Sequence, residues 1–508
     1  MSGPASALWS RIDELRAGST SAAPVTIGAR RRFRWVVSAI VPLTLTASAG
    51  VAVMLPESLP YAARITLFGF ALATILWSLT SMNAAYVALA VVVLVVLLGG
   101  ASQEHLFDSL ASDVIWLMIG AFVLGGALRT SGLAERLTAL ALRRSRTVGE
   151  TFWLVTIVLL PLSVFIPSTS GRAAVVLPLF RTLSDLFADR RITRALALLM
   201  PTIILVTTIS TLIGAASHLI AVDLLRQLTG DTITFAHWAL WGVPFGLAAA
   251  LASCWVVTRM FLDPELRARR LPAPASSTRA QQGGPQTQHI QRRNRLSRSE
   301  RITSTVLIAM VVLWLSEPVH GLEVATVTLV GALVLTMPRI GVISWKRGLA
   351  SVSWNLVVFV GAALTLGGAL IESGAGQWII DSLFSFGGLS ATSPTLVVVL
   401  FIALLTLTSH LYLTSHTVRA IALVPPFLYL AASMDLNPVA VLFIATVGMD
   451  FCLTLPVSSK AILVFQETDV DTFTPSDLMR LSAVLIVVHA VLMVVFYFGF
   501  WQWTGLAL

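Results

Sequence analysis

Two hydroxyl-rich stretches decide how this chain folds. The first reads STSGRAAVVLP at residues 168–178, and the second reads SHTVRAIALVP at residues 415–425. They align without a gap, and both have three polar side chains at the start, an arginine followed by an alanine, and a proline six residues after that arginine. Each stretch interrupts an apolar run, so we expect two helical hairpins, over residues 151–180 and 393–427, with the polar residues at their tips.

The composition predicts a membrane protein. Over 508 residues the chain is 56% hydrophobic and 12% charged, and its mean hydropathy is +0.86. A membrane helix needs about 20 apolar residues, and about eleven stretches of the chain suit that length. The expected fold class is an all-α membrane protein with about 11 transmembrane helices and two re-entrant helical hairpins.

The positive charges predict the topology. The net charge is +9, but the arginines lie between apolar segments and not among exposed aromatic residues, which argues against nucleic-acid binding. Placing the arginine clusters in the cytoplasm gives a multi-pass inner-membrane protein with a cytoplasmic N-terminus and an external C-terminus. This count requires that both hairpins enter and return on one side.

An internal repeat divides the chain. ILWSLTSMNAAYVA at residues 75–88 resembles VLWLSEPVHGLEVA at residues 312–325. Five crossings and one hairpin in each copy would place the second copy upside down, as an inverted-topology repeat. The expected parts are a cytoplasmic arm, a first transmembrane helix, the first repeat, a disordered basic cytoplasmic linker and the second repeat, at residues 1–34, 35–60, 61–258, 259–301 and 302–508.

A second interruption in each half completes the predicted site. It reads IGAASH at residues 213–218 and LPVSSK at residues 455–460. Free N–H groups at the starts of helices favour an anion, and hydroxyl groups add directional donors. The expected helix breaks opposite the hairpin tips contain Gly214, Ala215, Ser217 and Pro456.

These motifs resemble the divalent anion/sodium symporter family. Further similarities are the LWLSEP run at residues 313–318, the LPV run at residues 455–457 and the segment 238–247, so the resemblance covers about residues 60–505. It implies a homodimer with an elevator-like motion, and a small anion held by hydroxyl-bearing and imidazole side chains. The implied substrate-binding residues are Ser168, Thr169, Ser170, Ser415, His416, Thr417, Ser458 and Ser459.

The chain departs from the family pattern at the middle residue of each tip. Thr169 and His416 stand where the family has asparagine, which removes oxygen ligands and leaves sodium coupling open. Two readings of Arg172 and Arg419 also stay open. In the first reading the two arginines supply fixed positive charge in place of bound cations, which favours exchange. In the second they donate hydrogen bonds to carbonyl groups at a helix break.

The other ionisable residues predict no catalytic chemistry. His218, His410 and His489 are expected to pack between helices, and Asp450 to pair with Lys460. Cys254 and Cys452 lie in apolar runs without metal-ligand spacing, so we expect no disulfide, metal site or cofactor. No intramembrane catalytic constellation is present, which argues against an enzyme.

A carrier fits the sequence better than a channel, because the related hairpins come from two halves of one chain. Among carriers, the two arginines favour one for four- or five-carbon dicarboxylates, working by sodium-independent exchange. The alternatives are a sodium-coupled dicarboxylate symporter and a permease for sulfate or another inorganic oxyanion.

Overall fold

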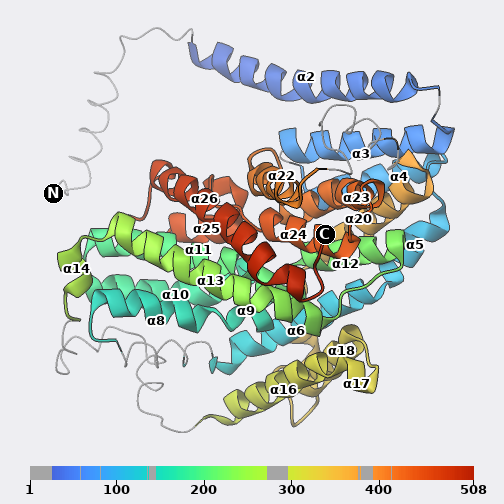
Figure 1. Cartoon of the computed structure of the whole chain (residues 1–508). Helices are drawn as coiled ribbons and strands as arrows, with labels where there is room; N and C mark the ends of the chain where they lie inside the picture. Colours follow the sequence, from blue (N-terminus) through green and yellow to red (C-terminus); the bar gives the residue numbers. More distant parts are fainter. Residues whose placement is uncertain are drawn as a thin grey trace, which may run out of the picture.

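The chain folds into a bundle of helices (Figure 1). The computed structural model describes residues 26–57, 59–80, 82–133, 136, 145–166, 168–271, 296–375, 378, 393–413, 415–468 and 470–508. Within these residues every named element is a helix, and the predicted all-α class is confirmed.

An outer helix, α2 (Thr26–Met54), precedes the first half of the fold and packs on α3 (Tyr61–Leu79) at the top of Figure 1. We call α3 to α13 the first half. Its helices are α3 (Tyr61–Leu79), α4 (Ala84–Leu97), α5 (Gln103–Ala111), α6 (Asp113–Ser131), α8 (Val148–Leu159), α9 (Leu162–Phe165), α10 (Thr169–Phe187), α11 (Arg190–Val206), η1 (Thr208–Ser210), η2 (Leu212–Gly214), α12 (Ala216–Thr229) and α13 (Phe235–Phe261).

A short helix, α14 (Pro264–Ala268), precedes the second half, which repeats the same order of long and interrupted helices. We call α16 to α26 the second half. Its helices are α16 (Arg298–Leu315), α17 (Glu317–His320), α18 (Val324–Thr336), α19 (Trp345–Ala350), α20 (Trp354–Glu372), α22 (Thr395–Thr408), η4 (Ser409–Leu411), α23 (His416–Ser433), α24 (Pro438–Met449), η5 (Pro456–Ser458), α25 (Lys460–Gln466) and α26 (Pro475–Gly499), followed by η6 (Trp501–Trp503).

The two halves pack against each other through equivalent pairs of helices. α6 of the first half packs on α18 and α19, and its counterpart α20 packs on α4 and α5. In the same way α12 packs on α23, and α25 packs on α10. The helix that follows each break therefore lies against the hairpin helix of the other half.

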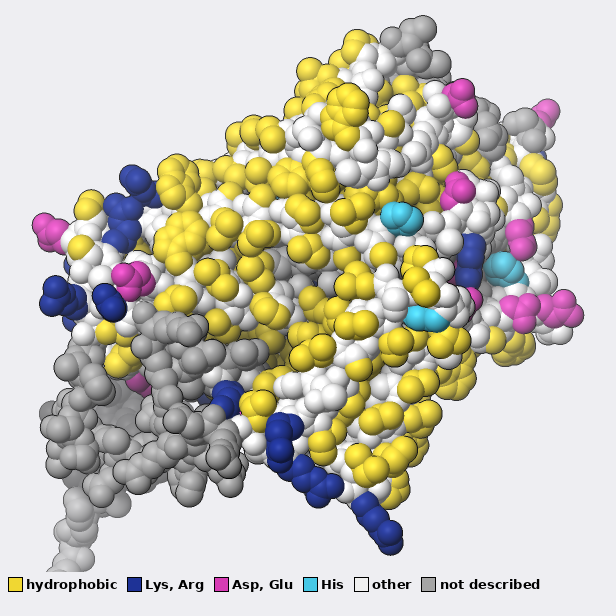
Figure 2. All heavy atoms as spheres, turned by 60° about the horizontal axis from the view of Figure 1, so that its bottom comes forward, with side chains coloured by type: hydrophobic (Ala, Val, Ile, Leu, Met, Phe, Trp, Pro, Cys, Tyr) yellow, Lys and Arg dark blue, Asp and Glu magenta, His cyan; other side chains and the backbone are white. Residues whose placement is uncertain are grey.

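The surface suits a lipid environment. Among the described residues, seven helices are long and apolar enough to cross a membrane, and five further apolar helices have 10–17 residues. Large apolar side chains such as Leu43 and Val319 are exposed. Figure 2 shows an apolar expanse with Lys, Arg, Asp and Glu side chains gathered toward its ends. This pattern is expected where lipid replaces water around the middle of a protein.

Both arms of the first hairpin end at the same side of the molecule. Thr147, just before α8, forms a backbone bridge with Arg270. Asp189, just after α10, forms an ion pair of 3.2 Å with the adjacent Arg269. The chain segment after α14 thus joins the start of α8 to the end of α10, and the polar residues between these helices form the tip of the hairpin.

Several predicted boundaries differ from the structure. The hairpin expected at 151–180 extends from Val148 to Phe187, and the one expected at 393–427 has helices from Thr395 to Ser433. The helix expected at 35–60 covers Thr26–Met54. Residues 1–25 of the predicted arm and 272–295 of the predicted linker lie outside the described residues, whereas the linker's described ends are helical in α13, α14 and α16. Apolar length finds the helices, but the capping residues set their ends.

Candidate functional site

The first hairpin tip is a capped helix start. Ser168 is the N-cap of α10, and its Oγ accepts a hydrogen bond of 3.2 Å from the Gly171 N–H. The hydroxyls of Ser168 and Ser170 lie 3.0 Å apart. Ser168, Thr169 and Ser170 are all partly exposed, so their donors remain accessible at the positive end of α10.

The second tip has the same place in the fold but a different polar set. Ser415 is the N-cap of α23 and makes no side-chain cap hydrogen bond. His416 follows it with a side chain that is 15% exposed, and Thr417 is buried. The imidazole of His416 reaches inward, where its Nε2 lies 2.9 Å from the Cys452 sulfur.

The two predicted breaks are present as interruptions of buried helices. In the first half α11 gives way to η1 and η2 before α12, and in the second half residues 450–455 and η5 separate α24 from α25. Ala215 and Ser459 are the N-caps of the following helices, both with extended backbone. Pro456 begins η5. Ser217 and Ser458 each bury a hydroxyl oxygen that has no hydrogen-bond partner within the described part of the chain.

Each hairpin arginine donates to the break in its own half. Arg172 is 1% exposed and donates to the carbonyl oxygens of Ile204 and Gly214 at 3.1 and 3.0 Å and to the Thr208 hydroxyl at 3.0 Å. Arg419 is fully buried and donates to the Phe451 carbonyl oxygen at 2.8 Å. The arginine and its first acceptor are 32 residues apart in both halves. Both arginines therefore tie a hairpin to a break.

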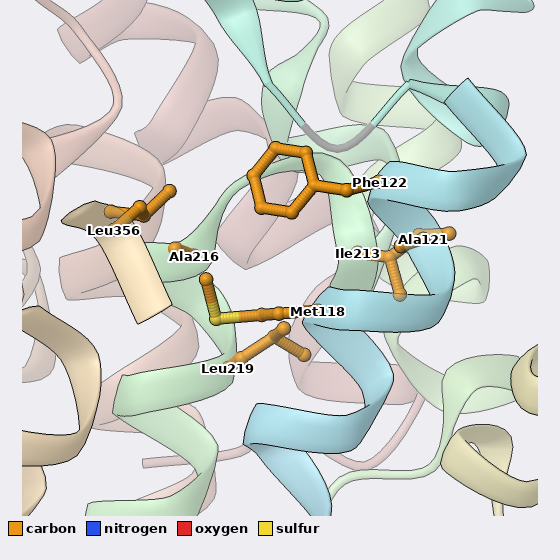
Figure 3. A pocket seen from close by; sticks show the side chains of 7 residues that line it. All are labelled: Met118, Ala121, Phe122, Ile213, Ala216, Leu219 and Leu356. Atoms are coloured by element: carbon orange, nitrogen blue, oxygen red, sulfur yellow. The ribbon is translucent and has the colours of Figure 1, made fainter. Parts of the chain in front are cut away.

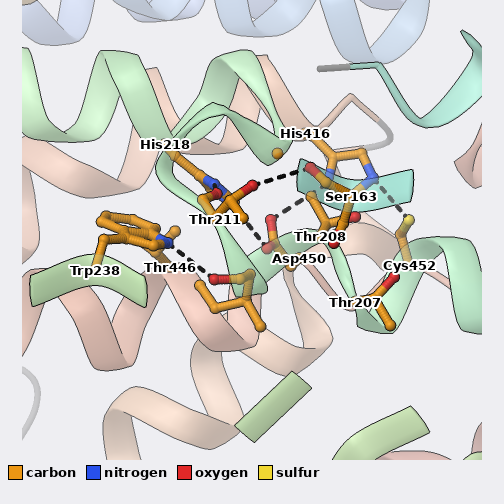
Figure 4. A network of polar contacts seen from close by, with 12 residues as sticks. Ser163, Thr207, Thr208, Thr211, His218, Trp238, His416, Thr446, Asp450 and Cys452 are labelled. Carbon is orange, nitrogen blue, oxygen red and sulfur yellow. Dashed lines mark hydrogen bonds and ion pairs between the residues drawn. The ribbon is translucent and has the colours of Figure 1, made fainter. Parts of the chain in front are cut away.

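A polar network joins the two halves at the centre of the bundle (Figure 4). Asp450 follows α24, and its Oδ2 lies 2.8 Å from Nε2 of His218 on α12. Its Oδ1 lies 3.8 Å from Nδ1 of His416. Nδ1 of His218 lies 3.0 Å from the Thr211 carbonyl oxygen, which can only accept, so the ring donates to Thr211 from Nδ1. The hydrogen bond between Nε2 and Oδ2 of Asp450 therefore holds one shared proton.

The expected pairing of Asp450 with Lys460 was wrong. The ion pairs of Asp450 within the described residues are with His218 and His416, while Lys460 is exposed. We also predicted packing alone for His218, although Nε2 of its ring lies 2.8 Å from a carboxylate oxygen of Asp450. An ionisable residue at each break was the available signal, because a charge inside a membrane protein needs a partner.

A cavity of about 290 Å³ lies beside the first tip. Ser168, Ser170, Gly171 and Ile166 line it from the hairpin, Phe122, Gly125 and Arg129 from α6, and Ser351 and Ser353 from the segment before α20. The lining combines hydroxyl donors with a guanidinium group, which suits an anion. The predicted residues of the second tip and of the breaks are not part of this lining.

An apolar seam adjoins the cavity. Met118, Ala121 and Phe122 of α6 and Leu356 of α20 face Ile213, Ala216 and Leu219 around the first break (Figure 3). The space between them is only about 10 Å³, so these side chains are close-packed. Phe122 lines both spaces.

Solved structures and known proteins show what this arrangement is similar to. The YdaH transporter of Alcanivorax borkumensis matches with a TM-score of 0.50 and 17% identity, over 77% of this chain and 86% of that one. A "Membrane protein" of Cupriavidus necator is 26% identical over 402 residues, which are 78% of this chain and 76% of that protein.

Two relatives from Escherichia coli K12 have described transport activities. The citrate/succinate antiporter is 23% identical over 371 residues, covering 70% of this chain and 72% of the antiporter. The L-tartrate/succinate antiporter is 24% identical over 402 residues, covering 76% and 78%.

The family model described as the sodium:sulfate symporter transmembrane region matches residues 37–507. This match confirms the resemblance drawn from the hairpin motifs, and it agrees with a transporter and not an enzyme. The chain belongs to the sodium:sulfate symporter family of multi-pass membrane transporters.

Proposed function

We propose that this protein is a sodium-independent exchanger of small dicarboxylates such as succinate. The two buried arginines carry the proposal, because each places a permanent positive charge beside a hairpin and a break. An uncompensated positive charge makes it costly for an empty site to cross the membrane, whereas a bound dianion offsets that charge. The site therefore crosses the membrane only when it holds an anion, so that one anion must be exchanged for another.

The relatives support the substrate class. Two of them are antiporters whose names include succinate. The cavity beside the first tip offers serine hydroxyls and Arg129, which suit the two oxygens of a carboxylate. Substrate contacts at Ser168, Thr169, Ser170, Ser415, His416, Thr417, Ser458 and Ser459 are part of this proposal.

The proposal includes the mode of movement. Eleven crossings with two re-entrant hairpins in inverted repeats would place the N-terminus in the cytoplasm and the C-terminus outside the inner membrane. The hairpins and breaks would move together as an elevator within a homodimer. The close-packed apolar seam between α6 and the first break supports such motion, because an apolar contact can slide without breaking hydrogen bonds.

The test is transport by the purified protein in liposomes. Labelled succinate is added outside, with or without internal succinate, and with or without a sodium gradient. We expect uptake that depends on internal succinate and is indifferent to sodium, and uptake at the level of empty liposomes when internal anion is absent.

Sodium-driven uptake without internal anion would contradict the exchanger and favour a symporter. Sulfate in place of succinate tests the remaining alternative. Exchange of sulfate without exchange of succinate would contradict the dicarboxylate assignment.

A further inference from the structure

Arg129 is a cationic side chain at the cavity beside the first hairpin tip. It lies in the last turn of α6 and lines the cavity together with Ser168 and Ser170 of the hairpin. Within the described part of the chain its guanidinium group makes no hydrogen bond and no ion pair. Arg172, which follows the same tip, instead donates to three acceptors of the first break. The donors of Arg129 are therefore free for a ligand in the cavity.

The guanidinium group of Arg129 lies over the preceding turn of α6. A Cβ atom at Gly125 would lie 3.6 Å from Nη1 of Arg129, and Gly125 lines the cavity as well. An arginine near the end of a membrane helix usually extends toward the lipid headgroups. Arg129 points back along its helix instead, and the absence of a side chain at Gly125 leaves room for its guanidinium group at the cavity.

The internal repeat does not require an arginine at this position. GGAL at residues 125–128 of α6 recurs as GGAL at residues 367–370 of α20, so the position of Arg129 corresponds to Ile371. In the second half an apolar residue thus satisfies the packing of this helix end. A charged side chain in a membrane helix is costly and usually marks the path of a substrate or an ion. Arg129 therefore needs a functional reason.

Hydroxyl groups from the segment before α20 line the cavity together with Arg129. Ser353 is the N-cap of α20 and makes no side-chain cap hydrogen bond, so its hydroxyl is free to donate to a ligand. Ser351 lies close to α6 because residue 126 is glycine, where a Cβ atom would overlap Oγ of Ser351. A guanidinium group and a free hydroxyl are a donor set that suits a carboxylate.

We propose that Arg129 binds the second carboxylate of the dicarboxylate. This inference rests on the proposed exchange of dicarboxylates. One carboxylate lies at the hairpin tip, on the hydroxyls of Ser168 and Ser170, and the other reaches across the cavity to Arg129 and Ser353. Arg129 is thus a specificity-determining residue that favours dianions over anions with a single carboxylate.

The contact with Arg129 belongs to only one orientation of the carrier. Arg129 is part of α6, which packs on α18 and α19, and not part of the hairpin. In the proposed movement the hairpins and breaks move against α6, so the anion leaves Arg129 behind when it crosses the membrane. The charge of Arg129 does not travel with the anion, and the balance between the dianion and the two hairpin arginines is unaffected.

The test compares succinate with succinamate, which has the same carbon chain but an amide in place of one carboxylate. Each compound competes with labelled succinate for exchange into liposomes loaded with unlabelled succinate. For the unaltered protein, half-inhibition should need about tenfold more succinamate than succinate, because one charge-assisted contact is lost. Arg129→Gln should raise the half-inhibiting concentration of succinate by about tenfold and so bring the ratio of the two compounds close to one.

Two further variants separate ligand binding from a general effect of charge. Arg64→Gln is the matched control, because Arg64 on α3 donates to the Leu59 carbonyl oxygen and does not line the cavity. It should keep the ratio of the unaltered protein. Arg129→Lys keeps the positive charge without the planar pair of donors, so its ratio should fall between those of the unaltered protein and Arg129→Gln.

Membrane vesicles of opposite orientation test the one-sided contact. Arg129→Gln should raise the succinate concentration for half-maximal exchange by about tenfold in only one of the right-side-out and inside-out preparations. Equal changes in both preparations would overturn a contact confined to one orientation of the carrier.

The outcomes separate the two proposals. An unchanged ratio in Arg129→Gln, or succinamate that competes in neither protein, would overturn the role of Arg129 and leave the exchanger standing. Absence of succinate exchange by the unaltered protein would contradict the proposed function and this inference with it.

Discussion

Arg172 and Arg419 occupy equivalent positions but use their guanidinium groups differently. Arg172 makes three hydrogen bonds to the first break. Among the described residues Arg419 makes one, and its Nε and Nη2 are buried without a hydrogen-bond partner, as is Nε of Arg172. A buried donor without a partner costs about 1–3 kcal/mol. Arg172 is therefore mainly a structural tie, whereas Arg419 is held by fewer hydrogen bonds and contributes mainly its charge beside Cys452 and Asp450.

Substitution by lysine should separate these roles. Lysine keeps the charge but cannot reach three acceptors in the geometry of a guanidinium group, so Arg172→Lys should lose about 2–3 kcal/mol of stability. Arg419→Lys should lose less stability and instead raise the succinate concentration needed for half-maximal exchange. Thermal unfolding in detergent and concentration-dependent exchange measure the two effects. A larger stability loss in Arg419→Lys would contradict this division.

At the scale of elements, the first break depends on a glycine. A Cβ atom at Gly214 would overlap the carbonyl oxygen of Thr208, because η1 and η2 fold the chain back on itself there. The Gly214 carbonyl oxygen also accepts from Arg172. The absence of a side chain thus lets the break close tightly enough to be tied to the hairpin.

Gly214→Ala should force the break apart and cost about 1–3 kcal/mol, the usual penalty of overpacking. The rate of succinate exchange should fall by a larger factor than the yield of folded protein, because the break adjoins the proposed site. Gly499→Ala is the control, since a Cβ at Gly499 meets no atom within 4 Å. Equal exchange rates in the two folded variants would show that the break tolerates the added methyl group.

The hairpins and breaks could be predicted from sequence because polar residues interrupt apolar runs at corresponding places in both halves. Helix ends could not, since Ser168, Thr147 and Thr474 set them through local capping hydrogen bonds. The contact between His218 and Asp450 was also beyond prediction. These residues are 232 positions apart, and only the packing of α12 against the second half brings them together.

At the scale of the whole molecule, the cavity and the seam indicate where parts of the protein move against each other during transport. Phe122 lines both the polar cavity and the close-packed seam, so the two spaces adjoin at α6. If the hairpins and breaks move against α6 and α20, the seam must separate or slide. The residues facing each other across it should then change partners during transport.

A cross-link across the seam should stop exchange. Ala121 of α6 and Ala216 of α12 line the same small space, so the double variant Ala121→Cys, Ala216→Cys should cross-link with a short thiol reagent. Exchange should be lost on cross-linking and return on reduction. Each single variant controls for the native Cys254 and Cys452, which are buried. Full exchange in the cross-linked protein would contradict relative motion at this seam.

The contacts between the two halves are reciprocal. α6 meets α18 as α20 meets α4, and α12 meets α23 as α25 meets α10. In an isologous dimer, one surface serves both partners in this reciprocal way. The interior of this chain thus has the reciprocal form that an interface between two identical half-length copies would have. Within one chain each copy is free to change its own side, and the tips differ accordingly, with Thr169 in one and His416 in the other.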